Sequence, residues 1–322
     1  MQTWLSTFET TLAVTGPVFL LVFLGALLYR AAWINDVFVQ TGSQLVFRLT
    51  LPLLIFISIL KAPLTDLFDI KLLAYVLVAS LLSYAFLVWI ARHWITQNAD
   101  KGAFIQGGFR GNLGIVGVAL ALNQYGATAL GQASLLLAWL ILVYNFLSVI
   151  ALNLYSPQQV NRAKGQQYLL MCLDMIKNPL ILAVAAGAAV RIFNISVPDT
   201  LMKTGQTLGN LTLPMALLCI GASLNLKALR EDPRLALMAS GIKLILIPVV
   251  FTLGAWLLGY QGQTLGILFL FFASPTAAAS YVMARAMGAN AALAANIIAM
   301  TTLGSIVTLT LGVFIGQSLQ VF

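Results

Sequence analysis

Long apolar runs alternate with short polar joints along the whole chain. A helix that spans a lipid bilayer needs about 20 mostly apolar residues, and ten segments meet this requirement. They cover residues 10–30, 38–60, 71–92, 103–123, 129–154, 169–192, 200–224, 235–259, 263–287 and 291–317. The longest polar joint, around 156–167, is too short to form a separate domain. The pattern predicts an all-α membrane protein with ten transmembrane helices.

The composition favours lipid as the solvent for much of this chain. Hydrophobic residues make up 61% of the sequence and charged residues 8%, whereas soluble domains carry about 25% charged residues. The net charge of +8 comes from basic residues scattered at the ends of apolar runs. Nucleic-acid-binding proteins instead cluster such residues on one face. We therefore expect the lipid bilayer as a partner, and no nucleic acid.

Several kinds of chemistry lack their usual residues in this sequence. The one histidine, His93, lies at a joint, and Cys172 and Cys219 lie in apolar runs without a His or Cys at ligand spacing, so we expect no metal site and no disulfide. No catalytic triad, HExxH motif or P-loop is present, so neither an enzyme nor an ATP-driven pump is indicated. No span has a central pair of carboxylates, the usual relay of Na⁺/H⁺ exchangers. We expect no cofactor.

The distribution of Lys and Arg predicts the orientation in the membrane. Joints after odd-numbered spans carry ten basic residues and joints after even-numbered spans carry four, with Arg48, Arg110 and Lys243 left out because they lie inside spans. Cytoplasmic joints are the more basic ones. This predicts a multi-pass plasma-membrane protein with odd-numbered joints in the cytoplasm and both termini outside.

The two halves of the chain resemble each other at an offset of 162 residues. Pro17 matches Pro179, Gly25 matches Gly187, and the tetrapeptide 49–52 is repeated in full at 211–214. Matched prolines and glycines indicate matched backbone requirements. The repeat therefore predicts two units, residues 1–160 and 161–322. Because each unit has five spans, an odd number, the second unit lies upside down in the membrane relative to the first. Inverted repeats are frequent in secondary transporters, with the site between the repeats; duplication kept only for folding is the alternative.

Spans 4 and 9 carry helix-breaking residues at matching places. Residues 106–117 contain five glycines, and Pro275 removes a backbone donor in the middle of span 9. Transporter sites are often built from such interrupted helices, and the N-termini of half-helices favour anions. The spans therefore predict a site for a carboxylate. The alternative is that the glycines permit close helix packing and the proline only kinks its helix.

Other polar residues within the spans extend this candidate site. Arg110 beside the first break could bind or steer an anion, or extend toward water. Asn145 and Asn296 could line the cavity or form hydrogen bonds between helices. We expect structural roles for Arg48 and Lys243. The full predicted substrate-binding set is Arg110, Gly111, Asn112, Leu113, Gly114, Asn145, Ser274, Pro275, Thr276 and Asn296.

Four short motifs resemble those of the auxin efflux carrier family of bacterial and plant transporters. They are Gly108–Gly114, Lys177–Pro179, Gly221–Leu224, and Ser274–Thr276 with the alanine-rich stretch that follows and Gly288. The resemblance covers essentially the whole chain. It implies two inverted five-helix repeats, as in bile-acid symporters and NhaA-type proteins. Residues 10–60 and 169–224 would form a scaffold, often dimeric, and 71–154 and 235–317 a mobile core in which spans 4 and 9 cross at their breaks.

The resemblance also implies a function. Family members carry small organic anions, such as auxin in plants and malonate or malate in bacteria, so a bacterial member would lie in the inner membrane. Asn112 would contact the substrate carboxylate, and the core would move against the scaffold in an elevator-type cycle. Proton-coupled, sodium-coupled and uncoupled transport all stay open. The alternatives are a membrane receptor that binds a carboxylate ligand without moving it and, less favoured, a channel.

Overall fold

The computed structural model describes residues 4–61, 69–127, 129–155, 179–224 and 233–322. Six of its helices are long and apolar enough to cross a membrane. The elements are α1 Trp4–Arg30, α2 Asp36–Leu45, η1 Val46–Thr50, α3 Leu51–Lys61, α4 Ile70–Trp94, α5 Asn98–Phe109, η3 Leu113–Gly117, α6 Val118–Tyr125, α7 Ala129–Leu154, α9 Pro179–Ile192, α10 Asp199–Asn210, α11 Thr212–Ala222, α12 Pro233–Gly241, η5 Ile242–Leu246, α13 Ile247–Leu257, α14 Gly262–Ala273, α15 Ala279–Ala286 and α16 Ala291–Ser318.

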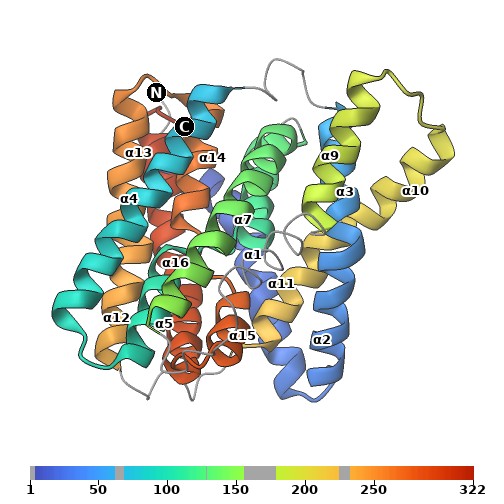
Figure 1. The fold of residues 1–322 in the computed structure, drawn as a ribbon. Coiled ribbons are helices and arrows are strands. Elements are labelled where there is room, and N and C mark those ends of the chain that lie inside the picture. Colours follow the sequence, from blue (N-terminus) through green and yellow to red (C-terminus); the bar gives the residue numbers. More distant parts are fainter. Residues whose placement is uncertain (1–3, 62–68, 128, 156–178, 225–232) are drawn as a thin grey trace.

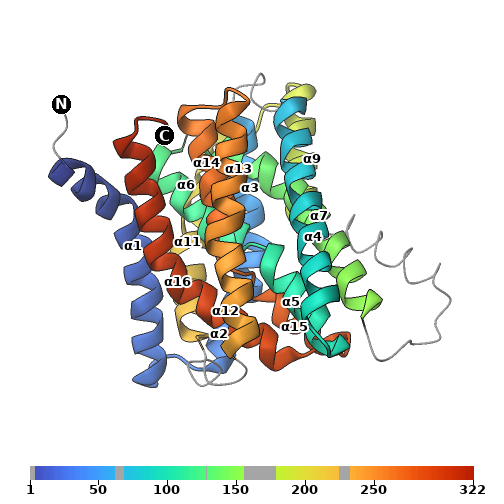
Figure 2. The same ribbon diagram turned by 90° about the vertical axis from the view of Figure 1, so that its left-hand side faces the viewer.

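The described part of the chain is all-helical, as predicted. Every predicted span contains helix, although only 179–192 of the sixth span lies in the described residues, and Cys172 and the joint around 156–167 lie outside them. The helices form an upright bundle with both chain ends at the same end of it (Figures 1 and 2). This placement fits an even number of crossings. The division into ten spans stays a prediction.

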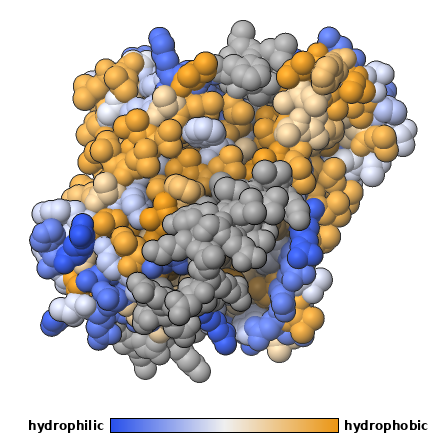
Figure 3. Space-filling view, in the orientation of Figure 1, coloured by the Kyte–Doolittle hydropathy of each residue, from blue (hydrophilic) through white to orange (hydrophobic). Residues whose placement is uncertain are grey.

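The surface of the bundle is suited to lipid. Figure 3 shows hydrophobic residues gathered across the upper and middle part of the visible face, and hydrophilic residues at its top edge and in its lower part. Large apolar side chains such as Leu20 and Phe23 are 68% and 62% exposed in the middle of α1. Trp33 and Trp94 are exposed at the ends of α1 and α4, where tryptophan commonly marks the boundary between lipid and water. This is a multi-pass membrane protein.

Glycines allow α1 to pack directly against α11. A Cβ atom on Gly25 would overlap the backbone of Leu218, and one on Gly221 would overlap the backbone of Val22. Such close approach of backbones is how small residues stabilise helix pairs in membranes, where no hydrophobic effect drives the helices together.

A second close helix pair, α9 against α3, has the same character. The Cβ position of Gly187 lies 3.2 Å from the carbonyl oxygen of Phe56. Gly187 and Gly25 are separated by 162 residues, and so are Leu218 and Phe56. The two contacts are therefore made by residues that match each other at the offset of the sequence repeat.

Proline positions coincide with irregular turns in three of the long helical segments. A π-turn, η1, precedes Pro52, and another, η5, precedes Pro248. The helix is interrupted at Leu211, just before Pro214. A proline cannot donate to the carbonyl four residues earlier, so the local hydrogen-bond pattern shifts. Pro52 and Pro214, the last residues of the repeated tetrapeptide, therefore both follow a distortion of their helical segment.

Aromatic and polar contacts fix α5 within the bundle. The ring of Phe109, at the end of α5, lies edge-on between Tyr84 of α4 and Tyr144 of α7, with centroid distances of 5.7 and 5.5 Å. At the other end of α5, the buried Asp100 carboxylate accepts a hydrogen bond of 2.8 Å from Asn290, the N-cap of α16. Both ends of α5 are thereby anchored, which positions the break that follows Phe109.

Candidate functional site

Two helical segments are interrupted near the centre of the bundle, as the sequence predicts. The first helix stops at Phe109 and resumes at Leu113, where the glycine-rich stretch lies. The second stops at Ala273 and resumes at Ala279, with Pro275 between. Within the described residues, an isolated antiparallel bridge between Gly111 and Thr276 joins the two interruptions.

Backbone hydrogen bonds connect the two breaks directly. The N–H of Asn112 donates to the carbonyl of Pro275 at 2.6 Å, and the N–H of Ala277 donates to the carbonyl of Arg110 at 3.0 Å. Non-helical backbone at membrane depth is tolerated only where its polar groups find partners in protein or water. Here each break supplies partners for the other. We call this arrangement the crossing.

Hydroxyl groups around the second break complete its hydrogen bonding. The N–H of Thr276 donates to Oγ1 of Thr301 on α16 at 3.0 Å, and Oγ1 of Thr276 donates to the carbonyl of Gly107 on α5 at 2.7 Å. Ser274 donates its hydroxyl to the carbonyl of Leu270, one turn earlier in α14. Thr276 and Thr301 therefore connect three elements, and the Ser274 hydroxyl is engaged within its own helix.

Two half-helices begin at the crossing, η3–α6 at Leu113 and α15 at Ala279. The first N–H groups of a helix have no carbonyl one turn earlier to bond, and this end carries a partial positive charge. Two such ends meeting at one place are suited to a carboxylate.

A fully buried lysine caps the half-helix that ends at the crossing. Lys243 lies in the π-turn η5, and its Nζ donates to the carbonyl of Phe272 at 2.6 Å, in the last turn of α14. Within the described residues no carboxylate accompanies this ammonium group. Gly111 lies directly beside it, with a Cβ position 3.3 Å from Nζ.

Arg110, in the first break, is bonded to neutral groups. Its Nη2 donates to Oδ1 of Asn145 at 2.7 Å, and its Nη1 lies 3.3 Å from Oγ of Ser148 and 2.6 Å from the sulfur of Met283. The described residues provide no carboxylate partner. The crossing is therefore flanked by two positive charges that neutral groups solvate, which makes it electropositive.

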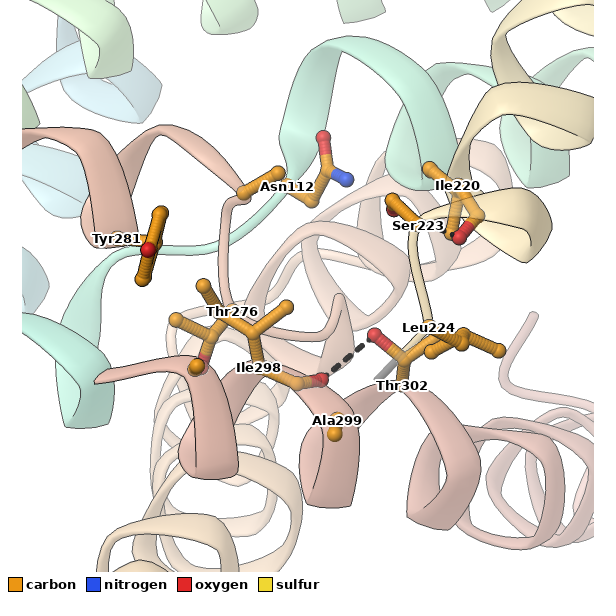
Figure 4. A pocket seen from close by; sticks show the side chains of 11 residues that line it. Asn112, Ile220, Ser223, Leu224, Thr276, Tyr281, Ile298, Ala299 and Thr302 are labelled. Atoms are coloured by element: carbon orange, nitrogen blue, oxygen red, sulfur yellow. Dashed lines mark hydrogen bonds between the residues drawn. The ribbon is translucent and has the colours of Figure 1, made fainter. Parts of the chain in front are cut away.

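A cavity of about 290 Å³ opens at the crossing, between the end of α11 and the helices α15 and α16 (Figure 4). Its lining residues are Asn112, Ile220, Ser223, Leu224, Thr276, Ala278, Tyr281, Ala295, Ile298, Ala299 and Thr302. Figure 4 shows Asn112 on the same side as Ile220 and Ser223, with Ile298 and Thr302 across from them. Within the described residues, the side-chain amide of Asn112 makes no hydrogen bond and is free for a ligand.

The structure divides the predicted binding set into lining and supporting residues. Asn112 and Thr276 line the cavity. Arg110 and Asn145 come together as a hydrogen-bonded pair, whereas Asn296 is fully buried on α16 and is not among the lining residues. The remaining predicted residues form the crossing or turn away from the cavity: Gly111, Leu113, Gly114, Ser274 and Pro275.

Some lining residues were absent from the predicted set. Ser223 belongs to the motif 221–224, which resembles a motif of the family but for which the sequence predicts no binding role. Thr302 follows Thr301 in an apolar span, and two adjacent hydroxyl residues in such a span are a usable signal of a polar site. Tyr281 in α15 carries no pattern that marks it out.

A second cavity, of about 270 Å³, lies between α1, α3, α6, α10 and α11. Its lining residues are Pro17, Val18, Leu21, Leu54, Ala119, Leu122, Asn123, Gly209, Asn210, Leu213, Pro214 and Leu217. The side-chain amide of Asn123 donates to the carbonyl of Val14 at 3.2 Å across this region. Asn112, the N-cap residue of η3, lines the first cavity, and Asn123 of α6, which continues η3, lines the second.

A helical membrane protein with a polar cavity where two interrupted helices cross has the architecture of a solute carrier. The chain belongs to the family described as "membrane transport protein", which matches residues 15–313, and the resemblance to the auxin efflux carrier family is thereby confirmed. It is 26% identical over 311 residues to a "putative malonate transporter" of Rhizobium meliloti, covering 91% of this chain and 92% of that protein. It is 22% identical over 300 residues to an "uncharacterized transporter" of Methanothermobacter thermautotrophicus, covering 91% and 94%.

Proposed function

We propose that this protein is a secondary transporter of small organic anions, namely carboxylates such as malonate, malate or auxin-like acids. The observation that carries the proposal is the charge of the crossing. Arg110 and Lys243 lie at it with neutral hydrogen-bond partners only, within the described residues. A buried cation without a counter-charge is costly, so an anionic ligand that supplies the missing charge is favoured there.

The donors around the first cavity are suited to a carboxylate. Asn112, the N-cap residue of η3, and Ala278, the N-cap residue of α15, both line this space, and hydrogen bonds to a charged acceptor are stronger than those between neutral groups. A volume of about 290 Å³ lies at the small end of the range for ligand sites, roughly 300–1,000 Å³. It favours an acid of three or four carbons, as does the malonate transporter named among the relatives.

The alternating-access mechanism is supported by the contacts that repeat at the 162-residue offset. In the scaffold, Gly25 contacts Leu218 and Gly187 contacts Phe56. In the core, Asn290 bonds the start of α16 to the start of α5, and Gln132 bonds the start of α7 to Thr264 at the start of α14. These bonds join corresponding pairs of helices in the two halves, although the bonded residues themselves are not 162 apart. These matches favour two inverted five-helix units, with boundaries near residue 160, that form a scaffold and a separate core.

Both cavities lie between helices of the proposed scaffold and helices of the proposed core, which favours an elevator-type cycle. With the odd-numbered joints in the cytoplasm, the cavity at Ser223 and Tyr281 opens toward the cytoplasm. The cavity at Pro17 and Asn123 then opens toward the outside. Movement of the core against the scaffold would present the crossing to each side in turn. We place the protein in the bacterial inner membrane with both termini outside, as a homodimer through its scaffold helices.

Uptake into proteoliposomes tests this proposal. Purified protein is reconstituted, and entry of labelled malonate, malate and indole-3-acetate is measured beside the Asn112→Ala variant. We expect saturable uptake of at least one acid, and an affinity about 10- to 100-fold lower in the variant, because the hydrogen bond to a charged group is lost. Equal uptake by both proteins would refute the site. Binding without flux would support the receptor alternative.

A further inference from the structure

Lys243 has features that an anchoring role alone does not require. Its side chain is fully buried, and a charged group at membrane depth is costly unless it has a function. It is carried by a π-turn, a feature frequently found at functional sites. At the offset of 162, the matching residue of the first half is Leu81, which is 44% exposed. The repeated architecture therefore does not itself demand a cation here.

The ammonium group lies at the carbonyl end of α14, bonded to one of its last carbonyl oxygens. Its Nζ lies 2.6 Å from the carbonyl oxygen of Phe272. A single point, the Cβ position of Gly111, lies 3.3 Å from Nζ and 3.4 Å from the carbonyl oxygen of Phe271. Both carbonyls belong to the last turn of α14, where a half-helix ends with a partial negative charge. In transporters with interrupted helices, such ends and unwound carbonyls coordinate sodium.

We propose that Lys243 is a resident cation. Its ammonium occupies the end of α14 where a mobile sodium ion would otherwise bind, and transport by this protein is therefore independent of sodium. The claim that transport is independent of sodium rests on the proposed transport function. The claim that the Lys243 ammonium occupies this site does not, because it can be tested without transport. Gly111 leaves room for the ammonium, because a Cβ atom there would lie only 3.3 Å from Nζ.

The site is tested first without any substrate. Thermal unfolding of detergent-purified protein is followed in sodium chloride, in choline chloride, and in choline chloride with propylammonium, which replaces the atoms that Lys243→Ala removes. We expect the wild type to unfold at the same temperature in all three. Lys243→Ala is expected to unfold at a lower temperature in choline, with several degrees recovered in sodium or propylammonium.

Two further variants separate charge from packing. Lys243→Met removes the charge but fills the space, so neither cation is expected to raise its unfolding temperature. Lys203→Ala makes the same change at an exposed lysine of α10 and is expected to behave as the wild type. A wild type stabilised by sodium, or a Lys243→Ala variant that responds to neither cation, would overturn the proposal. If Lys243→Ala does not fold, the proposal is judged on two results. A rise in the unfolding temperature of the wild type in sodium, or of Lys243→Met in either cation, would overturn it.

A transport measurement is the second test of the proposal. Malonate uptake by the wild type is measured with sodium replaced by N-methylglucamine on both sides of the membrane, and we expect an unchanged rate. A requirement for sodium would overturn the proposal. No uptake in either medium would instead contradict the proposed function, and the unfolding measurements would still decide whether Lys243 occupies a cation site.

Discussion

The backbone N–H of Asn112 donates to the carbonyl oxygen of Pro275 at 2.6 Å, which joins the two interrupted helices from opposite halves of the chain. The same residue lines the cavity, where its side chain lies opposite Ile298 and Thr302. One position therefore connects the geometry of the crossing with the recognition of a ligand. Substitutions at and around the crossing are expected to separate these two roles.

Thr276 is expected to matter chiefly for stability. Thr276→Val removes the hydroxyl that donates to the buried carbonyl of Gly107, and an unsatisfied buried group costs about 1–3 kcal/mol. Thermal unfolding in detergent should show this loss. Thr276→Ser keeps the hydroxyl and should retain most of the stability. An equally stable Thr276→Val variant would contradict the role of this bond.

The adjacent residues Thr301 and Thr302 should respond differently to the same substitution. Thr301 accepts the N–H of Thr276, so Thr301→Val should destabilise the protein by about 1–3 kcal/mol. Thr302 lines the cavity and donates only to its own helix. Thr302→Val should therefore leave the unfolding temperature nearly unchanged and weaken carboxylate binding. Unfolding curves and binding isotherms of the two variants test this contrast; equal effects on stability would contradict it.

Helix packing in the scaffold gives a matched pair within α1. Gly25→Ala would place a methyl group against the backbone of Leu218, and overpacking of this kind costs about 1–3 kcal/mol. Gly16→Ala meets nothing within 4 Å and should be neutral or slightly stabilising. Unfolding temperatures in detergent compare the two. The pairing of α1 with α11 would be contradicted if both variants behaved alike.

Adding a carboxylate beside Arg110 should lower affinity without lowering stability. In Asn145→Asp the new carboxylate would pair with the guanidinium that now bonds to a neutral amide, so the positive charge at the crossing is neutralised. We expect an apparent KM for carboxylate uptake raised roughly tenfold or more, with an unchanged or higher unfolding temperature. Asn98→Asp, at the exposed start of α5, is the control. Unchanged KM in Asn145→Asp would remove Arg110 from the site.

The positions of both breaks could be predicted from sequence, because glycine clusters and an internal proline are local features that disfavour helix. The sequence could not predict which residue of the first break pairs with which residue of the second. A repeat relates equivalent positions by a constant difference, so it matched Asn112 with Ser274. Antiparallel segments instead pair residues at a constant sum of their numbers, which is why Gly111 bridges Thr276 and Asn112 bonds to Pro275.

The role of a side chain could be predicted only where the sequence also indicates the place of the residue in the fold, as it does at a helix break. Asn112 at a break could be recognised from sequence, whereas for Lys243 the sequence indicates only a structural role, and its complete burial beside a helix end is visible only in the structure. Its role depends on which helix end it faces, and that is set by tertiary packing. The lining residues Tyr281 of α15 and Thr302 of α16 likewise come from two helices that pack against each other, and such packing is not visible in the sequence.

The crossing also has a consequence for biogenesis. The carbonyl of Arg110 and the N–H of Asn112 find their partners in Ala277 and Pro275, which the ribosome adds about 160 residues later. At roughly 5–20 residues per second, the first break waits on the order of ten to thirty seconds for these partners. During that interval its polar backbone needs water, lipid headgroups or the insertion machinery as a temporary partner. Completion of the nascent N-terminal half therefore depends on the arrival of the C-terminal half.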